Sequence, residues 1–188
     1  MEERSLERLR VGLRFTRRAV VAGSTLVFCD WPLLAIGADS DKAPTSVLFV
    51  CQFGSVKSAV AREAFRHIVA ESDLSVIARS RALTPADHLS PELKSLLFRD
   101  GVDPTNEPLR RLSQADLDEA DIVVVFSRLP EGFNARRVLD WTDAPALSED
   151  YEIARNDLFD RLRSLAQEIE KERASPLQCP IGQRTRCQ

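Results

Sequence analysis

Residues 46–62 read Ser-Val-Leu-Phe-Val-Cys-Gln-Phe-Gly-Ser-Val-Lys-Ser-Ala-Val-Ala-Arg, and this stretch decides the fold of the chain. Val47 to Cys51 form a β-branched and aromatic run that is typical of a buried parallel strand, and the residues from Ser58 onward suit a helix. The loop between them, 52–57, can turn its backbone N–H groups toward one point in front of the helix N-terminus. Such a concavity binds an oxyanion, and the same field favours the thiolate form of Cys51, which makes this cysteine a candidate nucleophile.

The spacing Cys-x5-Lys-Ser resembles the phosphate-binding loop of the low-molecular-weight protein tyrosine phosphatases and of the related thioredoxin-coupled arsenate reductases, which reads Cys-x5-Arg-Ser/Thr. The resemblance implies that Cys51 is the nucleophile, that Ser58 stabilises its thiolate, and that Lys57 stands where the family has arginine. Lysine offers one point charge, whereas arginine offers a planar fork that grips two phosphate oxygens, so Lys57 predicts weak turnover. The substrate-binding loop would consist of Gln52, Phe53, Gly54, Ser55 and Val56. Gly54 occupies a left-handed Asn position of the family, which glycine adopts without steric cost.

The rest of the chain alternates between apolar runs and helical patterns. Further strands are expected at 74–78, 122–126 and 137–139, and helices at 58–70, after Ser90-Pro91, and at 150–172 with Ile153 on its apolar face. Ser113 and Asp116 have capping-box spacing. This alternation predicts an α/β fold with a four-stranded, doubly wound parallel sheet of flavodoxin-like order 2-1-3-4 and helices on both faces. That order places the first loop at the topological switch point, where ligands bind.

A second candidate region follows the predicted fourth strand. In the family that this chain resembles, an Asp-Pro pair in the equivalent loop supplies the general acid. Asp143 is the best match, although Ala144 separates it from Pro145; Asp140 is the reserve candidate, and a turn-forming role is the alternative for both. Trp141, with Phe53, is a candidate apolar wall for a phenyl ring.

Another loop is expected at 80–88, and in the family the corresponding loop lines one side of the cleft. Arg79, Arg81 and His88 are therefore candidates for contact with substrate, and solvated charges are the alternative reading. The resemblance extends over about Thr45 to Glu172.

The amino-terminal segment has the order of a secretory signal. An arginine-rich region up to Arg18 precedes an apolar stretch at 19–28 and small residues before a polar segment at 39–42. Residues 16–21 resemble a twin-arginine export signal. The apolar stretch is too short to span a bilayer stably. We therefore expect a signal-like leader at 1–42, a phosphatase-like domain at 43–173 and a disordered tail at 174–188, with a periplasmic or exported location; a disordered cytoplasmic extension is the alternative.

Composition narrows the function classes. The chain has 188 residues and a formal net charge of −3, and it becomes more acidic without its arginine-rich start, so it is not expected to be a general nucleic-acid binder. Its four cysteines lack the spacing of a metal site, and no metal or cofactor is expected. Cys179 and Cys187 could close a disulfide in an oxidising compartment or remain exposed thiols.

Together these features predict a phosphomonoester hydrolase that forms a phosphocysteine intermediate on Cys51, with Asp143 protonating the leaving oxygen. Its partner would be a phosphorylated protein or a small phosphomonoester. Three alternatives remain open: a non-catalytic oxyanion-binding or phosphate-binding module, a phosphocysteine carrier, and an arsenate reductase. The last would have to use Cys179 and Cys187, because no other cysteine follows Cys51.

Overall fold

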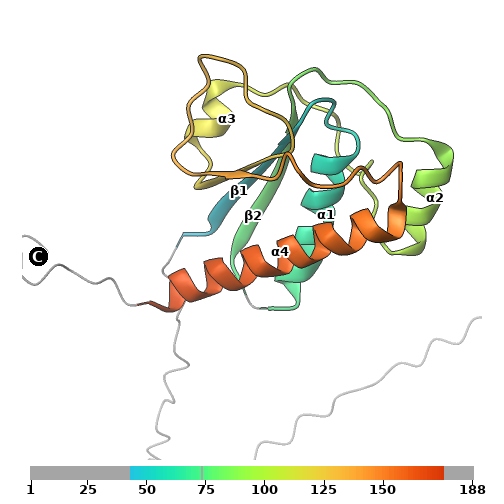
Figure 1. Ribbon diagram of the computed structural model, residues 1–188. Helices are drawn as coiled ribbons and strands as arrows, with labels where there is room; N and C mark the ends of the chain where they lie inside the picture. Colours follow the sequence, from blue (N-terminus) through green and yellow to red (C-terminus); the bar gives the residue numbers. More distant parts are fainter. Residues whose placement is uncertain (1–42, 73, 176–188) are drawn as a thin grey trace, which may run out of the picture. The chain divides into compact units, whose positions relative to one another are not determined.

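Four parallel strands form one sheet in the order β2-β1-β3-β4, as predicted (Figure 1). The computed structural model describes residues 43–72 and 74–175. In chain order the elements are β1 (Thr45–Cys51), α1 (Lys57–Ala70), β2 (Val76–Ala82), α2 (Pro91–Arg99), α3 (Gln114–Asp118), β3 (Ile122–Val125), β4 (Val138–Asp140) and α4 (Tyr151–Ala174). Since β1 lies between β2 and β3, its carboxyl end is at the point where the strand order reverses.

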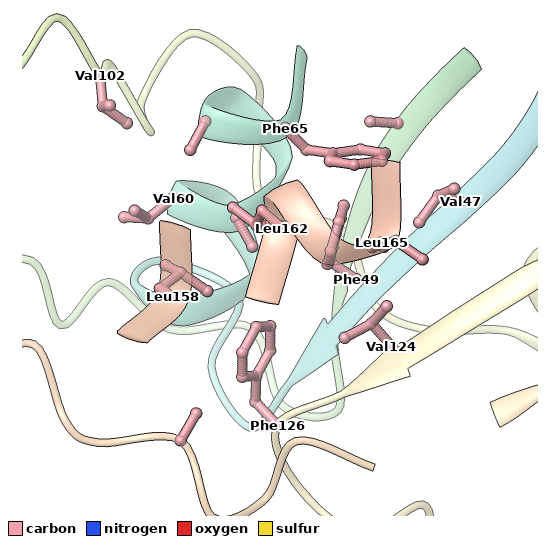
Figure 2. Packing of buried hydrophobic residues seen from close by; sticks show 14 of the residues in the cluster. Val47, Phe49, Val60, Phe65, Val102, Val124, Phe126, Leu158, Leu162 and Leu165 are labelled. Carbon is pink, nitrogen blue, oxygen red and sulfur yellow. The ribbon is translucent and has the colours of Figure 1, made fainter. Parts of the chain in front are cut away.

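Helices cover both faces of this sheet, and a separate apolar cluster fills each side. The larger cluster joins β1 and β3 to α1 and α4 through side chains such as Phe49, Phe65 and Leu162, which are fully buried (Figure 2). The smaller cluster lies on the α3 side and contains Leu48 and Leu117. Successive residues of β1 thus point to opposite faces, and both faces are buried, which explains why the strand is an uninterrupted apolar run.

The predicted helix starts are confirmed. Ser90 caps α2 by accepting a hydrogen bond from the N–H of Leu93, with Pro91 as the first helical residue. Ser113 and Asp116 form the predicted capping box of α3. Such local capping signals depend only on neighbouring residues, which is why sequence predicts them well.

Two predictions of local structure were wrong. The second strand is Val76–Ala82 rather than 74–78, and it therefore includes Arg79 and Arg81, which were placed on or beside a loop. Both arginines form ion pairs on the α3 side of the sheet, with Glu119 and Asp116. Ile153 is 62% exposed instead of buried. The fourth strand, Val138–Asp140, lies within one residue of its expected position.

Some predictions concern residues that the structure does not describe. The leader at 1–42, Cys179 and Cys187 lie outside the described residues. Within the described ranges, none of the helices has the length and apolar character needed to cross a membrane.

Candidate active site

The loop between β1 and α1 surrounds the sulfur atom of Cys51. The backbone N–H of Gly54 donates to Cys51 Sγ at 3.1 Å, and the Oγ of Ser58 lies 3.1 Å from the same sulfur. Cys51 is 6% exposed, and Ser58 is fully buried. A thiolate at this position would accept both hydrogen bonds.

Gly54 meets two steric conditions of this loop. Its φ is +81°, in the left-handed region that the sequence predicted for it. A Cβ at this position would lie 2.7 Å from the Cβ of Ala82 on β2. Glycine therefore allows the loop to turn back toward the sulfur while the chain passes close to the neighbouring strand.

Helix α1 begins directly at the loop. Its N-cap residue, Val56, provides no side-chain hydrogen bond to the first turn. The first N–H groups of a helix have no partner within the helix, and here no side-chain cap occupies them. The helix N-terminus therefore offers donors and a positive dipole end to an anion above Cys51.

A cavity of about 280 Å³ opens over this loop. Its walls come from the loop, from His88 and the start of α2, from the residues that follow β3, and from the segment between β4 and α4. The lining residues are Cys51, Gln52, Phe53, Ser55, Val56, Lys57, His88, Ser90, Leu93, Phe126, Ser127, Ala146, Leu147 and Ser148. The predicted loop residues are thus brought together, Gly54 lying behind them against Ala82. The sequence analysis did not predict the lining residues after β3, Phe126 and Ser127. The carboxyl ends of adjacent parallel strands lie at the same edge of a sheet, and this rule could have identified both residues.

Lys57 is directed toward the segment that follows β4. Its Nζ donates to the backbone carbonyl of Ala144 at 2.5 Å, and its side chain is partly buried. Lys57 also lines the Cys51 cavity. We call the 52–57 loop the oxyanion loop. The Lys57 cation thus lies between the oxyanion loop and the loop in which the general acid was expected.

The two predicted acid candidates lie elsewhere. Both oxygens of Asp143 accept from Arg161, at 3.0 and 2.8 Å, and the Asp143 side chain is 70% exposed. This hydrogen-bonded guanidinium holds the pKa of the Asp143 carboxyl below its usual value. Asp140 accepts from the N–H of Thr142. Hydrogen bonding from Thr142, its hydroxyl first and then this N–H, lowers the pKa of Asp140 as well. Of the described residues, those that line the Cys51 cavity include neither aspartate.

Trp141 does not reach this cavity either. It packs against Phe126 with ring centroids 5.8 Å apart, is partly buried against the main core, and lines a different hollow beside α4. Phe53, the other predicted apolar wall, does line the Cys51 cavity and is 40% exposed.

The segment after β2 runs along the oxyanion loop. Backbone N–H groups of Leu83, Thr84 and Ala86 donate to the carbonyls of Cys51, Gln52 and Phe53, respectively, at 3.1, 2.8 and 3.1 Å. The N–H of His88 then donates to Ser55 Oγ at 3.0 Å. The sequence analysis gave His88 as a candidate for contact with substrate. The backbone hydrogen bonds that fix its position could not be predicted, because almost any residue type can form them.

Comparisons with known proteins agree with this geometry. A family model described as low molecular weight phosphotyrosine protein phosphatase matches residues 46–132. YfkJ from Bacillus subtilis is structurally similar, with a TM-score of 0.59 and 22% identity over 70% of this chain and 98% of that chain. The solution structure of a low molecular weight protein tyrosine phosphatase from Bacillus subtilis gives a TM-score of 0.57 and 20% identity over 69% and 99%.

An arsenate reductase is also similar in fold. The thioredoxin-dependent arsenate reductase of Corynebacterium glutamicum gives a TM-score of 0.55 and 20% identity, over 70% of this chain and 65% of that one. A comparison with curated protein sequences found no match. At 20–22% identity these structures establish the fold alone. The sequence match to the phosphatase family comes from the family model. The predicted resemblance to the low-molecular-weight phosphotyrosine protein phosphatase family is thus confirmed, by the family model over residues 46–132 and by the shared fold over the domain.

Proposed function

We propose that this phosphatase-like domain hydrolyses phosphate monoesters through a covalent phosphocysteine on Cys51. The observation that carries the proposal is the position of the Cys51 sulfur, which lies 3.1 Å from both the Gly54 N–H and the Ser58 hydroxyl. These donors stabilise a thiolate before attack, and they stabilise it again as a leaving group when water releases the phosphate. The loop N–H groups and Lys57 would hold the three equatorial oxygens of the phosphoryl group.

The substrate that fits best is an aryl phosphate. Phe53, Leu93, Phe126 and Leu147 line the cavity above Cys51 and offer apolar surface to a ring, while the loop receives the phosphate. A phosphotyrosine side chain of a protein and a small aryl phosphomonoester share this chemistry. One structural neighbour is described as the YwlE arginine phosphatase, so the fold alone does not select the substrate.

Turnover of p-nitrophenyl phosphate tests the proposal. Wild type should hydrolyse it, Cys51→Ser should abolish hydrolysis, and Cys179→Ser should serve as the matched control with unchanged turnover. Mass spectrometry after rapid acid quench should detect a phosphate adduct on Cys51. Turnover that persists in Cys51→Ser would exclude the cysteine as the nucleophile.

A non-catalytic phosphate-binding module is the second candidate. Lys57 in place of arginine and the capture of Asp143 by Arg161 favour it, because both weaken catalysis and leave the oxyanion loop intact. Its signature would be protection of Cys51 from iodoacetate by phosphate or vanadate in a protein that turns over no aryl phosphate. The arsenate-reductase alternative has less support, since Cys51 is the one cysteine within residues 43–72 and 74–175.

For the amino-terminal segment, we propose a twin-arginine export signal, on the basis of Arg17 and Arg18 before the apolar stretch. Wild-type protein should appear in the periplasmic fraction with a new N-terminus close to residue 43, as determined by mass spectrometry. Replacing both arginines by lysine should retain the full-length chain in the cytoplasm, because the signal depends on the arginine pair and not on charge alone. An intact Met1 on cytoplasmic wild-type protein would refute export.

A further inference from the structure

The cavity over Cys51 contains one side chain suited to proton transfer. Among the described residues that line it, the titratable ones are Cys51, Lys57 and His88, and no aspartate or glutamate is included. Asp143 is held by Arg161 through both carboxylate oxygens. The Lys57 ammonium already donates to the carbonyl of Ala144. Histidine is the side chain that gains and loses a proton near neutral pH, so His88 is the candidate.

His88 is fixed to the oxyanion loop and not merely near it. Backbone N–H groups of the 83–86 segment donate to the carbonyls of residues 51–53. The next bond in this row is the one from the His88 N–H to Ser55 Oγ. Ser55 is itself 5% exposed, which anchors this bond in the folded domain. The histidine backbone therefore keeps one position relative to the phosphate site.

The ring of His88 lies at the mouth of the cavity. Its centroid is 4.0 Å from that of Phe53, with the planes tilted by 42°, and both side chains are exposed. The sulfur of Cys51, in contrast, is buried at the floor. In-line displacement places the attacking sulfur and the leaving oxygen on opposite sides of phosphorus, so the leaving oxygen points away from the buried sulfur, toward the exposed lining residues, which include His88.

We infer that His88, rather than a carboxylate, is the acid and base of the proposed reaction. The Cys51 thiolate forms a bond to phosphorus, the bond from phosphorus to the leaving oxygen breaks, and the His88 imidazolium gives its proton to that oxygen. Neutral His88 then takes a proton from water as the water oxygen bonds to phosphorus and the sulfur leaves. Phosphate, thiolate and imidazolium result. This inference rests on the proposed phosphatase function.

Two substrates that differ in their need for a proton test the inference. Phenolate is a poor leaving group, whereas p-nitrophenolate departs without protonation. His88→Gln should lower kcat/KM, which covers the steps through phosphoryl transfer to Cys51, by roughly 10²- to 10⁴-fold for phenyl phosphate, the usual contribution of a general acid, with a much smaller loss for p-nitrophenyl phosphate. His67→Gln, which alters the exposed histidine on α1, should leave the ratio of the two rates unchanged, and so should Asp143→Asn.

Each alternative result has a distinct meaning. Equal losses of kcat/KM on both substrates would reduce His88 to a positioning residue. A selective loss in Asp143→Asn would return the role to that carboxylate. Either result overturns the inference and leaves the phosphatase proposal intact. Absence of Cys51-dependent turnover in wild type would overturn both. If His88→Gln loses phosphate protection of Cys51, the wild-type enzyme provides the test. Its kcat/KM should vary little along a series of aryl phosphates of decreasing phenol acidity, and a steep decline would refute the proton donor.

Discussion

The Nζ of Lys57 donates a 2.5 Å hydrogen bond to the carbonyl oxygen of Ala144, and this bond joins the oxyanion loop to the segment after β4. The first prediction concerns this lysine. Lys57→Met should abolish both the protection of Cys51 by phosphate and the turnover of p-nitrophenyl phosphate, because the cavity loses its cation. Lys57→Arg should raise turnover about tenfold, since one added charge-assisted hydrogen bond contributes about 1.5 kcal/mol or more and each 1.36 kcal/mol changes the rate tenfold.

Steady-state kinetics and iodoacetate protection check both substitutions. Lys94→Met is the matched control, because Lys94 lies over the ring of Phe98 on α2 and does not line the Cys51 cavity. No turnover in wild type and in Lys57→Arg, with phosphate protection retained in both, would favour the binding module over the enzyme.

The second prediction separates backbone strain from crowding at Gly54. Gly54→Ala and Gly132→Ala both place a side chain on a residue with positive φ, at +81° and +92°. Each should lose about 1–2 kcal/mol in unfolding free energy from this strain alone. Gly54→Ala should lose more, and should also lose phosphate protection of Cys51, because its Cβ would meet the Cβ of Ala82 at 2.7 Å while the Cβ at 132 has open space. Equal unfolding free energies with intact protection in both variants would contradict this view of the loop.

The sequence predicted the fold because the decisive signals are local. The run before Cys51, the cap at Ser90 and the capping box at Ser113 each depend on residues within one turn or strand, and all three are confirmed. The boundaries of the second strand were predicted wrongly because the strand contains two charged residues, Arg79 and Arg81. Their partners, Glu119 and Asp116, are distant in sequence, so the signal that makes these positions acceptable in a sheet is not local.

The candidate site was predictable only in its loop. Residues from Cys51 to Ser58 are contiguous, and their spacing carries the chemistry. Asp143 could not be excluded from the cavity by sequence, because the side chain that holds it, Arg161, follows 18 residues later on another element. The position of His88 likewise depends on hydrogen bonds from backbone groups of the 83–88 segment, which any residue type can make.

The third prediction concerns acid stability at the junction of α2 and α4. The hydroxyl of Tyr151 donates to Asp100 at 2.7 Å, and Arg155 Nε lies 2.7 Å from the same oxygen. These contacts, the tyrosine bond first, hold the pKa of Asp100 below its usual value. A lowered folded-state pKa gives stability that is present above the unfolded-state pKa and is lost as pH falls through the folded-state value.

Tyr151→Phe should therefore lower the unfolding free energy by about 1 kcal/mol at pH 7, the usual net contribution of one hydrogen bond, and by less at pH 3. Urea unfolding at a series of pH values measures this difference. In an Asp100→Asn background the same tyrosine substitution should show no dependence on pH in this range, since the titrating group is gone. A Tyr151→Phe loss that stays constant from pH 7 to pH 3 in wild-type background would show that the carboxylate is not its partner.

The final prediction concerns a buried ion pair between two adjacent residues of α1. Arg62 Nε lies 2.5 Å from Glu63 Oε1, and the two side chains are 2% and 6% exposed. Asn106 connects the pair, accepting from Arg62 and donating to the second oxygen of Glu63. Glu63→Ala would leave the buried Arg62 guanidinium with Glu107, at 3.4 Å, as its remaining carboxylate. It should lower the unfolding free energy by about 3 kcal/mol, the lower end of the cost of breaking a buried pair. Asp160→Ala breaks the exposed pair with Arg163 and should cost about 1 kcal/mol or less in the same urea titration. Losses of equal size in the two variants would show that burial does not set the strength of the Arg62–Glu63 pair.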